Sequence, residues 1–277
     1  MPGPGSSGLR SVASRLPERL RDHNLTLVAA GVAFYSFLAF VPALIAFISI
    51  YGLVGDPHDV QRQVKDVASA LPKEVQSFLV FQLSSIIKAN SASVSITLVV
   101  AIVLALWSAS GGMAALITGI HVALEKDEPK GFVVKRGKAL ALTLAAIVFL
   151  SIVIFLIAAL PPLLSDLGTG ARVAFNVLRW PILAAVMIGG IGLLYRFAVK
   201  DGVHPKLGIV TPGAVVAMLG WLVVSALFAV YTANFSSYSK TYGALASIVV
   251  LLLWLWLSSL LVLVGAEVDG ISESSRA

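Results

Sequence analysis

The sequence predicts an all-α, polytopic membrane protein with about six transmembrane helices. Of its 277 residues, 58% are hydrophobic and only 12% are charged, and the mean hydropathy is +0.94. Soluble domains usually carry about 25% charged residues, so this chain has too few charges to coat a globule. Its apolar residues also form runs as long as a membrane-spanning helix requires. Because no polar linker interrupts these runs, we expect a single membrane domain.

Residues 1–24 are expected to form a cytoplasmic tail. Within the segment Leu9–Asp22, apolar residues recur every four positions and the arginines fall mostly between them. The apolar positions are Val12, Leu16 and Leu20. This spacing predicts a short basic amphipathic helix on the inner leaflet, which Pro17 could divide; a solvated charged leader is the alternative. The tail has no compact apolar segment before a small-residue cleavage site, so we expect no cleavable signal peptide.

Six apolar segments follow the tail, and each has room for the roughly 20 residues that cross the hydrocarbon core. The predicted spans are 25–53, 94–123, 139–163, 174–197, 208–236 and 243–268. Together they define a membrane domain over residues 25–270, followed by a C-terminal tail at 271–277. Pro42 and Pro212 fall in two of the spans, where neighbouring helices can satisfy the freed carbonyl groups.

The distribution of Lys and Arg predicts that both termini lie in the cytoplasm. With the N-terminus inside, the inner segments hold Arg10, Arg15, Arg19, Arg21, Lys126, Lys130, Lys135, Arg136, Lys138, Arg196, Lys200, Lys206 and Arg276. The outer segments hold Arg62, Lys65, Lys73, Lys88, Arg172, Arg179 and Lys240. Cytoplasmic loops are enriched in these residues, and the short loop 124–138 is the densest cluster. Orientation therefore explains the net charge of +6 without a nucleic-acid partner.

The first outer loop, residues 55–92, is expected to form a short amphipathic helical hairpin. Apolar residues recur at helical spacing on both sides of Pro72. They are Val60, Val64, Val67 and Leu71 before it, and Val75, Leu79, Leu83, Ile86 and Ile87 after it. Their apolar sides need cover, so we expect both helices to lie over the outer face of the bundle.

An ordered set of short motifs runs through the spans. The set comprises Ala33-Phe34-Tyr35-Ser36 and Pro42, then Trp107 and Gly111-Gly112, then Tyr195-Arg196 and Pro205, then Thr211-Pro212-Gly213-Ala214, Trp221, Phe228 and Tyr231, and finally Tyr238, Tyr242-Gly243, Trp254 and Gly265-Ala266-Glu267. From Leu25 to Asp269 the chain thereby resembles the YihY / BrkB / YhjD family of inner-membrane proteins. The resemblance implies a six-helix inner-membrane protein linked to envelope integrity, with transport of a lipid or small solute as the suspected activity. Members were once labelled ribonuclease BN, a label generally regarded as mistaken.

Several motif residues are candidates for a structural role or for lining a pathway. They are Tyr35, Pro42, Trp107, Arg196, Pro212, Gly213, Trp221, Tyr231, Tyr242, Gly243, Trp254 and Glu267. Glu267 ends the sixth span on the same side of the membrane as Arg196, which predicts an ion pair between them; two solvated end charges are the alternative. Packing is the favoured role for the tryptophans near mid-span, whereas Trp180 is typical of an interface.

Glycine and alanine recur every four residues in the second span, at Gly111, Ala115 and Gly119. Such a ridge of small residues lets two helix backbones approach, so we expect a helix contact within the protein rather than a dimer face. Gly189, Gly190 and Gly192 in the fourth span predict either packing contacts or a loosened helix.

No pattern for catalysis, metal binding or cofactor binding is present. The chain has no cysteine, and its four histidines lie on different segments. They are His23, His58, His121 and His204. Because HExxH, GxSxG and nucleotide-loop motifs are also absent, we expect no metal site, no cofactor and no enzyme activity.

Three functional hypotheses follow. Between the flanks of each span we find no Asp, Glu, Lys or Arg, which disfavours a proton-coupled pump. The leading hypothesis is a non-enzymatic inner-membrane protein that supports the cell envelope and moves a lipid or small amphiphile, with membrane lipids as its partners. The alternatives are a membrane scaffold for envelope proteins and a ribonuclease.

Overall fold

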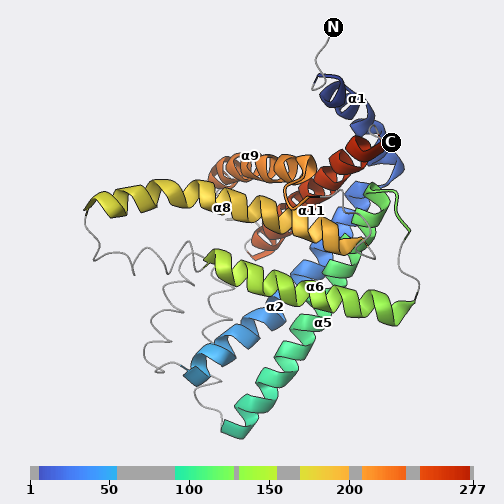
Figure 1. Cartoon of the computed structure of the whole chain (residues 1–277). Helices are drawn as coiled ribbons and strands as arrows, with labels where there is room; N and C mark the ends of the chain where they lie inside the picture. The colour runs from blue at the N-terminus through green and yellow to red at the C-terminus, as the bar shows by residue number, and fades with distance from the viewer. Residues whose placement is uncertain are drawn as a thin grey trace. The chain divides into compact units, whose positions relative to one another are not determined.

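In this computed structural model, the described residues are 6–54, 91–127, 131–154, 169–199, 208–234 and 244–274. All regular secondary structure within these ranges is α-helical, which confirms the all-α prediction (Figure 1). The helices are α1 (Ser6–Asp22), α2 (Leu25–Val54), α5 (Ser91–Ala123), α6 (Phe132–Ile154), α8 (Thr169–Ala198), α9 (Pro212–Asn234) and α11 (Ala244–Ser274).

Four segments of the described helices are long and apolar enough to cross a membrane. They are Ile102–Ala123, Val177–Ala198, Pro212–Tyr231 and Ile248–Ser274. A shorter apolar segment, Leu25–Ala39, belongs to α2. The chain is therefore a helical membrane protein, whereas the count of six spans stays a prediction. The hairpin expected at 55–92 falls almost entirely outside the described residues, and its last two positions belong to α5, which begins at Ser91.

The predicted N-terminal helix is confirmed. Helix α1 covers Ser6–Asp22 and continues through Pro17 without a break. Leu16 and Leu20 are half-buried, so the predicted apolar side is the one that packs. Asn24 then adopts a left-handed conformation, with φ of 49°, and its carbonyl oxygen accepts hydrogen bonds from the amides of Leu27 and Val28. This turn ends α1 and starts α2.

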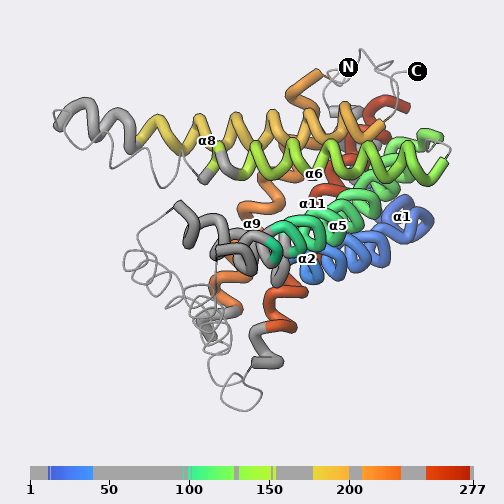
Figure 2. The backbone as a smooth tube through the Cα atoms, turned by 90° about the horizontal axis from the view of Figure 1, so that it is seen from below, coloured from blue at the N-terminus to red at the C-terminus, as the bar shows by residue number. Residues whose placement is uncertain are grey.

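The chain divides into two compact units, and α2, α5, α9 and α11 each contribute to both. Unit 1 comprises the described residues of 1–31, 113–225 and 257–277. Within it α6 and α8 run side by side (Figure 2), and the ring of Phe149 packs on Gly190. The contact at Gly190 shows that this glycine serves packing.

The C-terminal part of α11 forms the core of unit 1. Leu263 is fully buried and packs against Gly119 of α5, where an added Cβ would come 2.6 Å from its Cδ2 atom. The same added atom would come 2.9 Å from Val28 of α2. Gly119 therefore allows α5 to approach two helices at once, as the ridge of small residues predicted.

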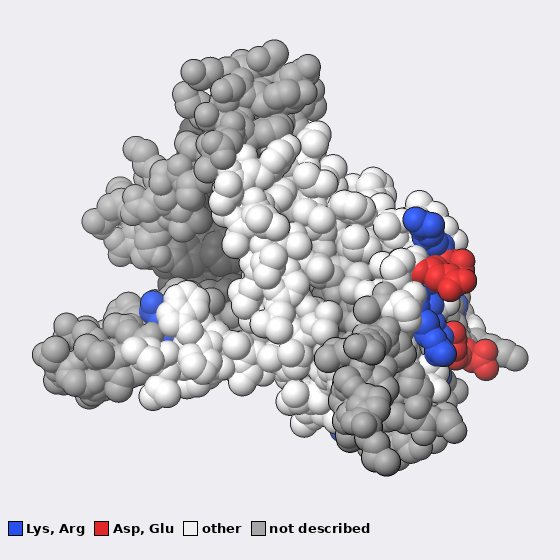
Figure 3. All heavy atoms as spheres, turned by 90° about the horizontal axis from the view of Figure 1, so that it is seen from above, with Lys and Arg blue, Asp and Glu red and all other residues white. Residues whose placement is uncertain are grey.

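Unit 2 comprises the described residues of 32–112 and 226–256. The ring of Tyr35 lies over Gly111, where an added Cβ would come 2.9 Å from its Cδ1 atom, so this end of the small-residue ridge is also a helix contact. The described residues of unit 2 include no Asp, Glu, Lys or Arg. All charged side chains in the described part of the chain consequently belong to unit 1, and most of those visible in Figure 3 gather at one edge.

Candidate functional site at the buried end of helix α11

Two carboxylates are buried near the end of α11. Glu267 is 0% exposed and Asp269 is 3% exposed. Transferring a charge out of water is costly unless the charge is paired and hydrogen-bonded. The two carboxylates find these partners on different helices, because Glu267 faces α1 and Asp269 faces the start of α9.

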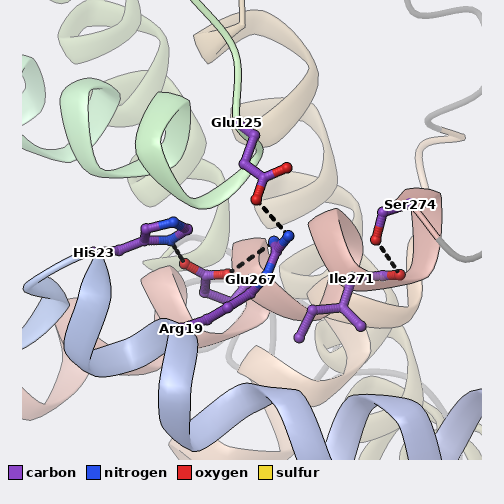
Figure 4. Close-up of polar contacts among 6 residues, drawn as sticks. All are labelled: Arg19, His23, Glu125, Glu267, Ile271 and Ser274. Atoms are coloured by element: carbon purple, nitrogen blue, oxygen red, sulfur yellow. Dashed lines mark hydrogen bonds and ion pairs between the residues drawn. The ribbon is translucent and has the colours of Figure 1, made fainter.

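Glu267 is paired with Arg19 of α1 and with His23, the residue directly after α1 (Figure 4). His23 Nδ1 is hydrogen-bonded to Glu267 Oε1, and Arg19 Nη1 lies 3.5 Å from Glu267 Oε2. Arg19 and His23 are four residues apart, and the amide of His23 donates to the carbonyl oxygen of Arg19, so the two side chains project from the same side of the chain. In Figure 1 the end of α1 lies beside the end of α11. The buried acid therefore ties the amphipathic helix to the helix at the core of unit 1.

Arg19 also reaches Glu125, just after the end of α5. Its Nη2 atom donates to Glu125 Oε1 at 2.5 Å, and the Glu125 side chain is 57% exposed. Glu125 has φ of 52°, and the amides of Glu125 and Lys126 donate to the carbonyls of Val122 and His121. This is a Schellman cap, whose left-handed position usually holds glycine. A glutamate there carries a backbone cost but supplies a carboxylate to Arg19.

Asp269 caps the N-terminus of α9. Its Oδ1 atom accepts a hydrogen bond from the amide of Gly213 at 2.7 Å, and Thr211 Oγ1 accepts one from the amide of Ala214 at 3.0 Å. Pro212 occupies the first turn, where its missing N–H costs nothing. The free amides and the helix dipole both favour a negative charge at this position. The Thr-Pro-Gly-Ala motif thus builds the partner of Asp269.

Two glycines allow α9 and α11 to approach closely at this point. A Cβ added to Gly213 would collide with the carbonyl of Gly265 and come 2.8 Å from Asp269 Oδ1. A Cβ added to Gly265 would come 2.8 Å from the Cβ of Ala217. The Gly-Ala-Glu ending of the sixth span therefore combines a helix contact with a buried acid.

Tyr195 of α8 completes the contacts. It is 0% exposed, and its hydroxyl donates to the carbonyl oxygen of Val262 at 2.5 Å. Since this carbonyl belongs to α11, the hydroxyl joins α8 to the turn that precedes Glu267. We call Arg19, His23, Glu125, Tyr195, Glu267 and Asp269 the α11 cluster.

The predicted pair between Glu267 and Arg196 is wrong. Arg196 is exposed, and Glu267 is paired with Arg19 and His23 instead. Adjacent residues of a helix point about 100° apart. Because Tyr195 takes the inward position on α8, Arg196 cannot share it. Arg19 and His23 each follow a half-buried leucine, Leu16 or Leu20, by three residues. This spacing signals that both face the packed side of α1, but it does not identify the acid that they contact.

Of the other predicted candidates, Pro212 and Gly213 lie at this cluster, because the Gly213 amide donates to Asp269. The rest do not converge on it. Trp221 is half-buried, and its Nε1 donates to Ser258 Oγ at 3.1 Å, as a packing role requires. Trp107 is 57% exposed, so the prediction that it packs inside the bundle is wrong. The remaining candidates in unit 2 are the exposed Tyr35 and Tyr231 and the half-buried Trp254. Tyr242 and Gly243 lie outside the described residues, as do the surroundings of the Pro42 side chain.

The contacts of the α11 cluster hold helices together. Each of its two buried carboxylates contacts protein groups, and His121, also buried, directs Nδ1 at the carbonyl oxygen of Ile117, 2.9 Å away. Among the described residues, no group of three His, Asp or Glu side chains is placed to hold a metal ion. The cluster connects α1, α5, α8 and α9 to the end of α11.

Comparison with known proteins supports the resemblance seen in the motifs. The family model described as virulence factor BrkB matches residues 16–277. The putative ribonuclease-like protein YfkH of Bacillus subtilis is 34% identical over 177 residues, covering 61% of this chain and 63% of that protein. A UPF0761 membrane protein of Verminephrobacter eiseniae is 28% identical over 277 residues, covering 94% of this chain and 61% of that protein.

A UPF0761 membrane protein of Tolumonas auensis is 41% identical over 80 residues, 29% of this chain and 26% of that protein. The chain spans less than two thirds of the length of each of these relatives. No solved structure matches it. Since the family model covers nearly the whole chain, including every residue of the α11 cluster, this protein belongs to the BrkB family of membrane proteins.

Proposed function

We propose that this chain is a non-enzymatic, multi-pass protein of the bacterial cytoplasmic membrane that moves a lipid or small amphiphile, with both termini in the cytoplasm. One observation carries the proposal: the described residues of unit 2 hold no charged side chain at all. The helices also present many large aliphatic side chains on their surfaces, among them Leu227 at 65% exposure and Val249 at 60%. Such surfaces suit contact with acyl chains.

The placement of charge separates this activity from ion-coupled transport. A charged side chain near the bilayer centre costs at least about 2.5–3.5 kcal/mol, and proton or ion carriers accept that cost to bind their cargo there. The described apolar segments contain no such group between Trp180 and Tyr195, or between Pro212 and Tyr231. An amphiphile whose tail stays in the lipid requires no charge at mid-depth.

Reconstitution into vesicles tests the proposal. Purified protein is incorporated into vesicles that contain a phospholipid with a fluorescent headgroup, and dithionite is added outside. In proteoliposomes we expect dithionite to quench the label of both leaflets, because the protein moves labelled lipid from the inner to the outer leaflet. In protein-free vesicles we expect dithionite to quench the outer-leaflet label only. The same assay is repeated with a fluorescently labelled single-chain amphiphile, which tests a smaller transported molecule. Equal quenching with and without protein, for both labelled molecules, would contradict the proposal.

A ribonuclease is the alternative that the name of the Bacillus subtilis relative favours. General acid–base cleavage of RNA needs catalytic groups that reach a substrate in water. Glu267 and Asp269 are buried and bonded to the protein, so they are poorly placed for it. RNA cleavage that co-purifies with the protein and disappears on His204→Ala or Asp201→Ala would favour the nuclease. If the protein is instead a membrane scaffold, we expect neither lipid movement nor RNA cleavage.

A further inference from the structure

Arg179 is a charged residue in an otherwise apolar stretch of α8. It lies inside the membrane-compatible segment Val177–Ala198, although the count of loop charges assigned it to an outer segment. Its neighbours are exposed and apolar, with Val177 at 65%, Leu178 at 56% and Ile182 at 47% exposure. These neighbours give this part of α8 an apolar surface suited to lipid.

The depth of Arg179 can be worked out from helix geometry. Arg196 marks the other end of the apolar stretch, 17 residues away, which corresponds to about 25 Å along the helix. The hydrocarbon core of a bilayer is about 30 Å thick. With Arg196 at one boundary, the Cα atom of Arg179 lies about 5 Å inside the other. An arginine at that depth extends its side chain towards the headgroups to keep its charge solvated.

The guanidinium group lacks an anionic partner within the described part of the chain. Its Nε atom is buried and has no hydrogen-bond partner there. Its Cζ atom lies 5.2 Å from the centroid of the Trp180 ring, a cation–π arrangement. Trp180 is 64% exposed, as expected of a tryptophan at a membrane interface. The pair is thus an apolar-flanked cation held near the depth of the headgroups.

We propose that Arg179 and Trp180 form a binding site for the phosphate group of a membrane phospholipid, in the half of α8 remote from the α11 cluster. The planar guanidinium fork matches two phosphate oxygens, and phosphate is the anion that every phospholipid carries at this depth. Trp180 holds the guanidinium in place through its ring face, while Val177, Leu178 and Ile182 contact the acyl chains. The site does not depend on transport, because a permanently bound lipid would occupy it equally well.

The experiment uses purified full-length protein in a maltoside detergent, which has no phosphate. Thermal unfolding is followed while phosphatidylglycerol, diacylglycerol or inorganic phosphate is added. Diacylglycerol supplies the same tails without phosphate, and inorganic phosphate supplies the anion without tails. We expect phosphatidylglycerol to raise the melting temperature of the wild type well above the effect of either control. Native mass spectrometry of the same samples counts the retained phospholipids.

Arg179→Gln should weaken the apparent affinity for phosphatidylglycerol about tenfold, the loss expected for a charge-assisted hydrogen bond. It should also reduce the number of retained phospholipids by one. Arg196→Gln is the matched control, since it removes an exposed arginine from the other end of the same helix. Arg179→Lys should keep part of the affinity for phosphatidylglycerol, and Trp180→Phe should lose part of it. If Arg179→Gln folds poorly, these two variants test the site in its place.

Three results would overturn the assignment. Arg179→Gln and Arg196→Gln could weaken phosphatidylglycerol binding equally, which would make the effect one of net charge. Diacylglycerol could stabilise the wild type as well as phosphatidylglycerol does, which would leave no role for phosphate. Inorganic phosphate could match the phospholipid at equal concentration, which would identify a site for a soluble anion instead.

Discussion

Replacing Glu267 with Gln removes the charge that holds Arg19 of α1 and the following residue His23 against the end of α11. Glu267 is 0% exposed, and the Arg19 side chain is 17% exposed. Breaking a buried ion pair by removing one partner costs about 3–5 kcal/mol, because the other charge is left uncompensated. Here Arg19 keeps Glu125, and a glutamine can still bond to His23, so we expect a loss of about 2–3 kcal/mol.

A double-mutant cycle separates the pair from other effects. Glu267→Gln and Arg19→Gln should each lower the melting temperature in detergent, by roughly 5–10 °C for the first. The double variant should lose less than the sum, with a coupling of at least about 1 kcal/mol. Glu125→Gln is the control for the exposed partner and should cost less than about 1 kcal/mol. Arg196→Gln should have little effect and should add independently to Glu267→Gln.

Additivity in the Arg19 and Glu267 cycle would refute this reasoning. It would mean that α1 is held by its apolar residues alone and that the buried acid is stabilised by other groups. A coupling between Arg196 and Glu267 as large as that between Arg19 and Glu267 would likewise contradict the pairing described above.

Three further substitutions probe the contacts around α11. Gly213→Ala places a Cβ 2.8 Å from Asp269 Oδ1 and should cost about 1–3 kcal/mol by detergent melting; Gly137→Ala, with no atom within 4 Å, is its control and should be neutral or stabilising. Asp269→Asn should lower stability by about 1 kcal/mol through loss of the charge at the start of α9, and a stability gain would contradict the capping role. Tyr195→Phe should cost about 1 kcal/mol by the same assay, and no change would show that its hydroxyl is readily replaced by water.

The helices themselves could be predicted from the sequence because their signals are local. An apolar run of about 20 residues has few structural alternatives, and the spacing of Val12, Leu16 and Leu20 indicated α1. The close contacts at Gly111 and Gly119 followed from a simple rule, since small residues at intervals of four create a flat helix face.

The partners of the buried acids could not be predicted in the same way. Helices that are apolar on all sides carry no periodicity that shows which residue faces inward. Tyr195 and Arg196 were therefore indistinguishable in orientation, and Trp107 was wrongly expected inside. The pairing of Glu267 with His23 joins residues 244 positions apart, and no local pattern in the sequence identifies a contact between such distant residues.

The orientation of the chain in the membrane, with both termini in the cytoplasm, is part of the proposed function. Single cysteines can test it directly, because the chain contains none. The substitutions Ser6→Cys, Gln76→Cys, Lys130→Cys and Ser274→Cys are made one at a time, and intact cells are treated with an impermeant thiol reagent. Our account predicts labelling at position 76 alone, with the other three positions reacting only after the membrane is permeabilised. Labelling at position 130 in intact cells would contradict it.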